Sequence, residues 1–493
     1  MMKSLWSIEE ILKAVSGKLL GTLPTNAEIT GIAFDNREVR DGDLFIALPG
    51  AENDGHDFVG DALNRGAVAT LVSQPLPSDI EQNYASKIIR VADVPKALNA
   101  LARFARGRMS GKVIGITGSA GKTSTKEALY KTLGRGGFVH ASEKSYNNHV
   151  GVPVSLARMP RNSHYGVFEL GMNASGEIDQ LAAMVKPDIA IITSIGSAHR
   201  AAFSSLKDIA LAKAEIFNNM TRGGTVVLPK ECDHFDTLLL AAHKAGVSKV
   251  IITSTKDENA DVYVERMVAH ENCTCMTVNV FGKRLTLKIG MPGMHWVSNS
   301  LNVLAAVYLV GGDLGLAGVA LGEIHGVDGR GVHHYVDGED ASFTLIDDSY
   351  NANPISMQAS LSVLGAMQPK SKMGSRIAVL GDMEELGEIS NEAHLALSDH
   401  LAMAQVKKFY GYGPAMAELC KALEKQNMFH VQAHCFASKA ELLISLRRQI
   451  RTGDIVLIKG SNSQNLNEVV DGLLALHQED EDDWAQHSSL VEY

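Results

Sequence analysis

The stretch KVIGITGSAGKTSTKE, residues 112–127, decides the fold because it predicts a strand, a tight turn and a helix in succession. The β-branched residues at 113, 114 and 116 are typical of a buried strand, and residues 126–133 have the pattern of a helix. The glycines between these segments predict the turn that joins them. Because backbone N–H groups and the helix dipole converge at such a turn, it is a site where a phosphate group could bind.

The turn matches only the second half of the general phosphate-binding loop, G-x-x-x-x-G-K-[ST], because Ile116 stands where that pattern has its first glycine. The remaining half still directs the ammonium of Lys122 at an anion and places the hydroxyl of Thr123 for a Mg²⁺ ion. The residues that we expect to contact nucleotide here are Thr117, Gly118, Ser119, Ala120, Gly121, Lys122, Thr123 and Ser124. The loop by itself indicates an NTPase or a kinase, and a glycine-rich turn that binds no phosphate stays open as the alternative.

Length and composition bound the class of protein. The chain has 493 residues, which at roughly 100–200 residues per domain suggests about three domains. Its 45% apolar and 21% charged residues are typical of a globular protein. A formal net charge of -10 argues against a general nucleic-acid coat or an anionic membrane as partner.

The cysteines and the N-terminus predict the compartment. The 5 cysteines are odd in number and form no CxxC pair, which argues against a disulfide framework or a zinc site and indicates a reducing environment. Glu9 and Glu10 interrupt the segment that would be the apolar core of a signal peptide, and no apolar run is long enough to span a membrane. We therefore expect a soluble, cytoplasmic protein.

Strand-like and helix-like runs alternate along most of the chain, which predicts an α/β protein with parallel sheets. The expected strands after the loop are residues 166–170, 188–195, 224–228, 343–346, 377–380, 409–412 and 455–458. We expect three α/β domains in series, at residues 1–108, 109–325 and 326–478. The last stretch, residues 479–493, begins Glu-Asp-Glu-Asp-Asp and predicts a solvated, disordered acidic tail.

Several segments, taken in order with the loop, resemble the Mur ligases of peptidoglycan synthesis over nearly the whole chain. They are residues 117–123, 147–153, 169–173, 292–299, 329–330 and 347–354. The family's own loop pattern is T-G-x-x-G-K-[ST], so Ile116 is no departure from it. Residues 169–173, 347–354 and 380–387 resemble the branch that adds D-alanyl-D-alanine, and residues 35–37, 42–45 and 55–58 are similar to its UDP-binding domain.

The resemblance implies a fold and an activity. The fold would be an N-terminal UDP-binding α/β domain, a central P-loop domain with a parallel sheet that binds the mononucleotide, and a C-terminal Rossmann-like domain. The activity would be an ATP-dependent amide ligase that joins D-alanyl-D-alanine to UDP-N-acetylmuramoyl-tripeptide through an acyl phosphate, with release of ADP and phosphate. An ionised carboxylate is a poor electrophile, so its phosphorylation supplies a leaving group. We expect ATP and two Mg²⁺ ions, no nucleic-acid partner, no membrane insertion and a monomer.

The same resemblance assigns catalytic roles to Lys122, Glu169, His199, Lys213 and Arg330. Lys122 would hold the β and γ phosphates, Thr123 and Glu169 would ligate the first Mg²⁺, and His199 would ligate the second. Lys213 matches a lysine that family members carry as a carbamate, which would help to hold the second Mg²⁺. Arg330 would reach the γ-phosphate when the C-terminal domain closes. Ordinary surface or helix positions remain the alternatives for Glu169, His199 and Lys213.

Further residues would bind the base, the ribose and the UDP substrate. The resemblance gives His295 and Asn299 to the adenine, Asp348 and Asn351 to the ribose, Asn36 and Arg37 to the UDP substrate, and Asn147 and Asn148 to the muramoyl-peptide arm. Arg37 would pair with the pyrophosphate, and a surface arginine in a turn stays open as the alternative. The chain departs from the family pattern at Ala201, Trp296 and Asn462. At position 296 the family has Asn, so a polar base contact is lost and the indole could stack on a ring instead.

Other functions stay open at this point. Within the same class of enzyme they are another Mur ligase or a relative of folylpolyglutamate synthase, and outside it a nucleotide-binding regulator that has lost catalysis. No motif identifies the third residue of the tripeptide, which is meso-diaminopimelate or lysine in this family.

Overall fold

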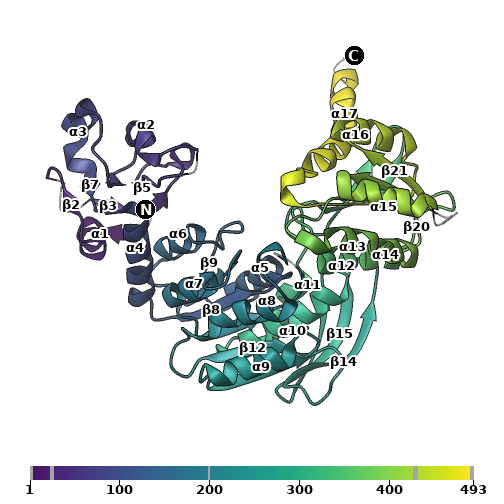
Figure 1. Ribbon diagram of the computed structural model, residues 1–493, viewed down its shortest axis with the longest axis horizontal. Coiled ribbons are helices and arrows are strands. Elements are labelled where there is room, and N and C mark those ends of the chain that lie inside the picture. The colour runs from purple at the N-terminus through teal and green to yellow at the C-terminus, as the bar shows by residue number, and fades with distance from the viewer. Residues whose placement is uncertain (1–3, 23–26, 51, 198–199, 426–430, 489–493) are drawn as a thin grey trace.

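The structure is a computed structural model and describes residues 4–22, 27–50, 52–197, 200–425 and 431–488, of which residues 478–488 are described by their backbone alone. Three α/β units follow one another along the chain. The N-terminal and C-terminal units project from the central unit as two arms (Figure 1). None of the helices in the described residues is long and apolar enough to cross a membrane.

The N-terminal unit is built on a five-stranded sheet in the order β2-β7-β6-β5-β4, beside a two-stranded ribbon of β1 and β3. In the sheet all neighbours run parallel except β2 and β7. Its elements are β1 (Trp6–Ser7), α1 (Ile8–Val15), β2 (Lys18–Leu19), β3 (Glu28–Ile29), β4 (Gly31–Ala33), η1 (Asn36–Glu38), β5 (Asp43–Ile46), η2 (Gly55–Phe58), α2 (Val59–Asn64), β6 (Ala69–Val72), α3 (Ser78–Tyr84), η3 (Ala85–Lys87), β7 (Ile88–Arg90) and α4 (Val94–Arg108).

The central unit has a nine-stranded sheet in the order β16-β15-β14-β13-β12-β11-β8-β10-β9. Its elements are β8 (Lys112–Thr117), α5 (Lys122–Gly134), β9 (Val139–Ala141), α6 (Gly151–Ala157), β10 (Tyr165–Glu169), α7 (Glu177–Val185), β11 (Ile189–Ile192), η4 (Arg200–Ala202), α8 (Leu206–Ala214), η5 (Glu215–Phe217), β12 (Thr225–Pro229), α9 (Phe235–Lys244), β13 (Lys249–Ser254), β14 (Val262–Ala269), β15 (Thr274–Val280), β16 (Lys283–Ile289), α10 (Met294–Leu309) and α11 (Leu314–Gly322).

The strands from β9 to β14 are parallel, and β15 and β16 extend the sheet as an antiparallel pair. The expected strands at 166–170, 188–195 and 224–228 are confirmed as β10, β11 and β12. The first strand, β8, lies inside the sheet with later strands on both sides, so the chain reverses its direction of travel there. Open α/β sheets bind ligands at the carboxyl end of the strands at such a point.

The C-terminal unit has a six-stranded sheet in the order β17-β18-β22-β19-β20-β21, parallel except for β17. The four strands expected in this part of the chain are present as β18, β19, β20 and β22. Its elements are β17 (Val332–Asp337), β18 (Ser342–Asp348), α12 (Pro354–Ala366), β19 (Arg376–Gly381), η6 (Gly387–Ile389), α13 (Ser390–Leu395), α14 (Leu397–Met403), β20 (Val406–Tyr412), α15 (Pro414–Lys425), β21 (Gln432–Phe436), α16 (Lys439–Gln449), β22 (Ile455–Lys459), η7 (Asn462–Gln464) and α17 (Asn467–Ser488).

Two features of the C-terminal unit differ from expectation. Cys420 of α15 and Cys435 of β21 form a disulfide, although the cysteine spacing argued against one. The packing of α15 beside β21 brings the two thiols together, and a count of cysteines along the chain does not reveal that packing.

The backbone of residues 479–488 continues α17, where we expected a disordered tail. A helix that is already nucleated gains a hydrogen bond for each residue added, so extension costs little.

Candidate active site

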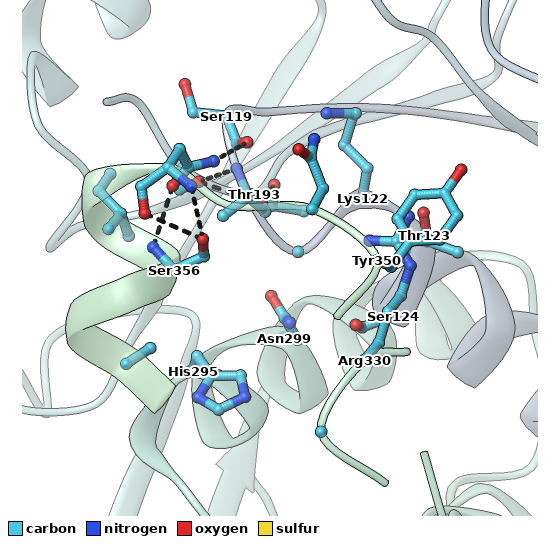
Figure 2. A pocket seen from close by; sticks show the side chains of 18 of the residues that line it. Ser119, Lys122, Thr123, Ser124, Thr193, His295, Asn299, Arg330, Tyr350 and Ser356 are labelled. Atoms are coloured by element: carbon cyan, nitrogen blue, oxygen red, sulfur yellow. Dashed lines mark hydrogen bonds between the residues drawn. The ribbon is translucent and has the colours of Figure 1, made fainter. Parts of the chain in front are cut away.

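A cavity of about 790 Å³ lies between the central and C-terminal units, at the carboxyl end of β8. The central unit contributes the phosphate loop, the end of β10 and the start of α10 to its walls, and the C-terminal unit contributes the end of β18 and the first turns of α12. The expected site residues that line it are Ser119, Ala120, Gly121, Lys122, Thr123, Ser124, Asn147, Asn148, Glu169, His295, Asn299, Arg330, Asp348 and Asn351. Segments far apart in the sequence therefore meet here (Figure 2).

The phosphate loop enters α5 at Gly121, which has a positive φ of 83°. A Cβ atom at this position would come within 2.9 Å of Oδ1 of Asn299, so only glycine fits both the backbone and the space. The first turn of α5 then presents N–H groups that have no partner inside the helix. Together with the helix dipole these groups form an anion site at the cavity wall.

Residues after β11 hold the loop in this shape. The Ser119 N–H donates to the carbonyl of Ser194 at 2.9 Å, and the Ala120 N–H donates to the Ser194 hydroxyl at 2.9 Å. The Thr193 hydroxyl donates to the carbonyl of Ala120. Thr193 and Ser194 were not among the expected site residues, because a Thr-Ser pair after a strand carries no signal of a partner 74 residues away.

Glu169 ends β10 and is buried, with 1% of its surface exposed. The Thr123 hydroxyl donates to its Oε2 at 2.8 Å, and the Asn147 amide donates to its Oε1 at 2.7 Å. A carboxylate and a hydroxyl at a helix N-terminus are hard oxygen donors of the kind that Mg²⁺ prefers, so this pair fits a magnesium ion. Asn147 also lines the cavity, and its expected contact with the muramoyl-peptide arm stays a prediction.

Lys122 donates from Nζ to the carbonyl of Gly118 at 2.8 Å, across the turn of the loop. Burial lowers the pKa of this lysine, and the nearby carboxylate of Glu169 partly offsets the effect. Thr117, the last residue of β8, and Gly118 do not line the cavity, so their expected contact with nucleotide stays a prediction. A phosphate bound at the loop would compete with the Gly118 carbonyl for the Lys122 ammonium.

Lys213 is buried in α8, with 2% of its surface exposed. Burial lowers its pKa well below the usual value, and the positive charge of Lys122 lowers it further. The residue does not line the cavity, and it lies close enough to Cys232, which does, to interact with it electrostatically. His199, the other expected ligand of the second metal, lies outside the described residues. The described part of the chain contains no group of three or more His, Cys, Asp or Glu side chains that could hold a metal.

Arg330 brings a positive charge from the C-terminal unit to the cavity. Its guanidinium lies 4.1 Å from the centre of the Tyr350 ring, and its Nη2 donates to the Ser145 hydroxyl at 3.1 Å. Stacking and the hydrogen bond fix the direction of a side chain that would otherwise have many rotamers. Figure 2 shows Arg330 and Tyr350 in the same view as Lys122 and Thr123 of the loop.

The acidic residue expected to bind ribose is already paired. Oδ2 of Asp348 lies 2.8 Å from Nζ of Lys459, which is 2% exposed and also donates to the carbonyl of Asn351 at 2.8 Å. The Ser360 hydroxyl donates to the same Asp348 carboxylate. A ribose hydroxyl would therefore bind to a carboxylate whose position is set by Lys459 and Ser360.

The remaining part of the cavity suits a flat, partly apolar ring. His295 and Asn299 line it from α10, and the imidazole of His295 is exposed toward the cavity. Nδ2 of Asn299 is buried and has no hydrogen-bond partner in the described residues. Trp296 is 2% exposed and packs in the hydrophobic core of the central unit, and it also lines the cavity, so the expected stacking of its indole on a ring stays a prediction.

The other expected residues lie as follows. Asn36 and Arg37 form part of η1 in the N-terminal unit and do not line the cavity; Arg37 is paired with Asp35 at 2.6 Å. Oδ1 of Asn148 accepts from the Gly151 N–H at 2.8 Å, at the start of α6. Ala201 donates its N–H to the carbonyl of Glu385 at 2.9 Å, which joins the central and C-terminal units. Asn462 lines the cavity.

Comparisons with known proteins agree with this arrangement. The model described as "Mur ligase family, catalytic domain" matches residues 28–107, "Mur ligase middle domain" matches residues 116–307, and "Mur ligase, glutamate ligase domain" matches residues 334–462. The UDP-N-acetylmuramoyl-tripeptide--D-alanyl-D-alanine ligase of Bacillus subtilis is 31% identical over 473 residues, which is 95% of this chain and 98% of that protein. The Escherichia coli ligase of the same name is 31% identical over 471 residues, which is 95% of this chain and 98% of that protein.

Solved structures are similar as well. MurF from Acinetobacter baumannii superposes with a TM-score of 0.81 at 27% identity, over 96% of this chain and 99% of that one. MurF ligase from Thermotoga maritima, in complex with ADP, has a TM-score of 0.76 at 25% identity, over 91% of this chain and 98% of that one.

Proposed function

The chain belongs to the Mur ligase family, and on this premise we propose that it is the ATP-dependent ligase that joins D-alanyl-D-alanine to UDP-N-acetylmuramoyl-tripeptide. One observation carries the proposal most strongly. Lys122 and Glu169 of the central unit and Arg330 of the C-terminal unit line one cavity, although about 160 residues separate Glu169 from Arg330 along the chain. Positive charge from two domains around a phosphate loop is what a phosphoryl transfer between two anions requires.

The reaction has two steps. A terminal carboxylate oxygen of the tripeptide attacks the γ-phosphorus of ATP, the bond to the β-γ bridging oxygen breaks, and ADP leaves. The amine of D-alanyl-D-alanine then attacks the carbonyl carbon of the acyl phosphate, loses a proton, and expels inorganic phosphate as the amide forms. Lys122 and Arg330 offset negative charge during the first step, and the N–H groups of the first turn of α5 orient the phosphates.

Thr123 and Glu169 are the residues that would hold a Mg²⁺ ion, whose charge would be shared with the phosphate oxygens of ATP. Asn147 would keep the Glu169 carboxylate turned toward that ion. We further propose that Lys213 is carbamylated and that, with His199, it belongs to a second metal position. A buried lysine with a lowered pKa has the neutral amine that reaction with CO₂ needs.

The proposal extends to the surroundings of the enzyme. We assign the chain to the cytoplasm, where it acts as a monomer on UDP-linked precursors of peptidoglycan, and we assign Asn36, Arg37 and Asn148 to the UDP substrate. Arg37 would have to exchange its Asp35 partner for the pyrophosphate, a change that costs little because the pair is exposed.

Phosphate release tests the function directly. The purified chain is given ATP, Mg²⁺ and UDP-N-acetylmuramoyl-tripeptide, with D-alanyl-D-alanine, L-alanine, D-glutamate or diaminopimelate as the amine. We expect phosphate release that depends on D-alanyl-D-alanine, and a product heavier by one dipeptide residue in mass spectrometry. Release with a different amine would move the chain to another branch of the family. Nucleotide binding without release would indicate a regulator.

A further inference from the structure

The first turn of α12 touches the phosphate loop across the boundary between the central and C-terminal units. Nδ2 of Asn353 donates to the carbonyl of Ser119 at 3.2 Å. Two residues further on, Ile355 lies against Gly196 in the segment that follows β11. We call these four residues the α12 contact; Figure 2 draws hydrogen bonds made by Ser119 and by Ser356 of α12.

The amide of Asn353 makes two different bonds. Its Oδ1 accepts from the Ser356 N–H at 3.0 Å and so caps α12, a bond within the C-terminal unit. Its Nδ2 makes the bond to Ser119, which crosses to the central unit. Among the described residues this is the one hydrogen bond from the C-terminal unit to the phosphate loop. The cap therefore fixes the amide in the orientation that reaches the loop.

The rest of Ser119 is held from the central unit. Its hydroxyl donates to the carbonyl of Gly196 at 3.0 Å and accepts from the Gly196 N–H at 2.9 Å. Gly196 is in turn covered by Ile355, because a Cβ atom built at position 196 would lie 1.9 Å from Cδ1 of the isoleucine. Three segments therefore contact one another here: the phosphate loop, the segment that follows β11, and the first turn of α12.

We propose that Asn353 is a positioning residue. Its bond to Ser119 couples the docking of the C-terminal unit against the central unit to the conformation of the phosphate loop. The Ser119–Ala120 peptide leads directly into Gly121 and Lys122, whose N–H groups face the nucleotide. When α12 is docked against the central unit, the Ser119–Ala120 peptide is held by hydrogen bonds from both units. The inference rests on the proposed function, since it takes the loop to be the ATP site.

Substitutions at Asn353 separate the two bonds. Asn353→Ser keeps a good helix cap and removes the bond to Ser119, so we expect the melting temperature to stay unchanged. The KM for ATP and the Kd for ADP should rise about three-fold to ten-fold, which corresponds to the loss of one neutral hydrogen bond. The KM for UDP-N-acetylmuramoyl-tripeptide should not change. Asn353→Ala loses both bonds and should also lower the melting temperature.

Asp313 provides the matched control. Its Oδ1 caps α11 by accepting from the Leu316 N–H at 2.8 Å, and Asp313 does not line the cavity. Asp313→Ala should lower the melting temperature and leave the KM for ATP unchanged. If Asn353 only capped α12, Asn353→Ala would likewise lower the melting temperature without changing the KM for ATP, and Asn353→Ser would change neither quantity.

Gly196 tests the contact without altering Asn353. Gly196→Ala should push Ile355, and with it α12, away from the loop, and so raise the Kd for ADP as Asn353→Ser does. Adding Ile355→Ala removes the atoms within 2.8 Å of the new methyl group and leaves Cβ at 3.9 Å, so the double variant should recover most of the lost affinity. Ile355→Ala alone gives the reference value.

The outcomes are distinct. An ADP affinity unchanged in both Asn353→Ser and Gly196→Ala, or a double variant no better than Gly196→Ala, would overturn the coupling. ADP binding by calorimetry needs no turnover. If the wild type released no phosphate with D-alanyl-D-alanine, the proposed function would fail, and the calorimetric comparison would still decide the role of Asn353.

Discussion

The carboxylate of Glu169 has both of its oxygens occupied, one by the Thr123 hydroxyl and the other by the Asn147 amide. If Glu169 ligates Mg²⁺ as we propose, its buried and hydrogen-bonded carboxylate is fixed before the metal binds. The orientation of Glu169 is thus set by a residue that does not itself need to touch the metal.

Asn147→Ala should therefore weaken Mg²⁺ binding while it leaves the ligands in place. We expect the Mg²⁺ concentration for half-maximal phosphate release to rise about 10-fold to 100-fold, the usual cost of losing a partner of a metal ligand. At saturating Mg²⁺ the rate should recover most of its value. Glu169→Gln is the comparison, and its rate should stay low at any Mg²⁺ concentration. An unaltered Mg²⁺ requirement in Asn147→Ala would show that the amide does not orient the carboxylate.

Lys213 couples stability to pH. In the unfolded chain its amine keeps a proton up to about the ordinary pKa of 10.5, whereas burial lowers the folded-state pKa well below that value. Between these two values the unfolded chain binds more protons, so the free energy of unfolding rises with pH; below the folded-state pKa the full cost of burying the charge remains.

Lys213→Met removes this cost. We expect the variant to have a higher melting temperature than the wild type at about pH 7, and this difference should shrink as the pH is raised toward 10. Ligase activity should fall by about 10²-fold to 10³-fold, as for loss of an electrostatic group in an active site. Melting curves across the pH range test the first part and phosphate release the second. The wild type should be measured with and without added bicarbonate, because a carbamate would stabilise the folded state. A lower melting temperature in the variant under all these conditions would contradict the argument.

Among the elements, the strand-loop-helix of β8 and α5 was predictable because its signals are local. β-branched residues, glycines and a helical pattern follow one another within residues 112–134. Features that depend on packing between distant segments were not predictable in this way. The sequence around Asn353 and Pro354 signals only a helix cap, and the partner at Ser119 lies 234 residues away. The disulfide between Cys420 and Cys435 follows from the packing of α15 against β21 in the same manner.

In the candidate site, too, local motifs predicted some features, and packing between distant segments decided the others. A resemblance of motifs located Lys122, Glu169, His295 and Arg330, and all four line the cavity. Motifs do not say which side chain bonds to which. The expected ribose ligand Asp348 proved to be paired with Lys459, because a buried lysine needs a partner that only the folded chain supplies.

The junction of β1, α4 and α6 depends on one side chain. Trp6 is 1% exposed, its indole N–H donates to the carbonyl of Ala157 at 2.8 Å, and the guanidinium of Arg108 lies 3.6 Å from the centre of its ring. Trp6→Ala leaves a cavity and an unpaired carbonyl. We expect a loss of about 3–5 kcal/mol in the free energy of unfolding, measured by urea denaturation followed by circular dichroism. Met403→Ala, at a position that is 77% exposed, should change it by less than about 0.5 kcal/mol.

At the scale of the whole molecule, one segment contacts both arms. The loop at residues 142–148 bonds to the N-terminal unit through Lys144 and Glu38 at 3.1 Å, and to the C-terminal unit through Ser145 and Arg330 at 3.1 Å. Figure 1 shows the two arms extending from the central unit that carries this loop. This loop therefore connects the two arms through one piece of chain.

Closure of the arms around the substrates is the resulting prediction. Small-angle X-ray scattering should give a smaller radius of gyration when UDP-N-acetylmuramoyl-tripeptide and a non-hydrolysable ATP analogue are both present than with either alone, because a phosphate bound at the loop would add a further contact to Arg330 of the C-terminal unit. Arg330→Ala should reduce the change. Scattering that is identical in all mixtures would rule closure out.

The large central sheet ends in two edges that other extended chains could pair with. At one edge β9 has only the three residues Val139–Ala141. At the other, β16 exposes the basic side chains of Lys283, Arg284 and Lys288, and α11 packs against it. Short and charged edges resist pairing with further strands. The edges of the nine-stranded sheet therefore disfavour amyloid-like growth by addition of further strands.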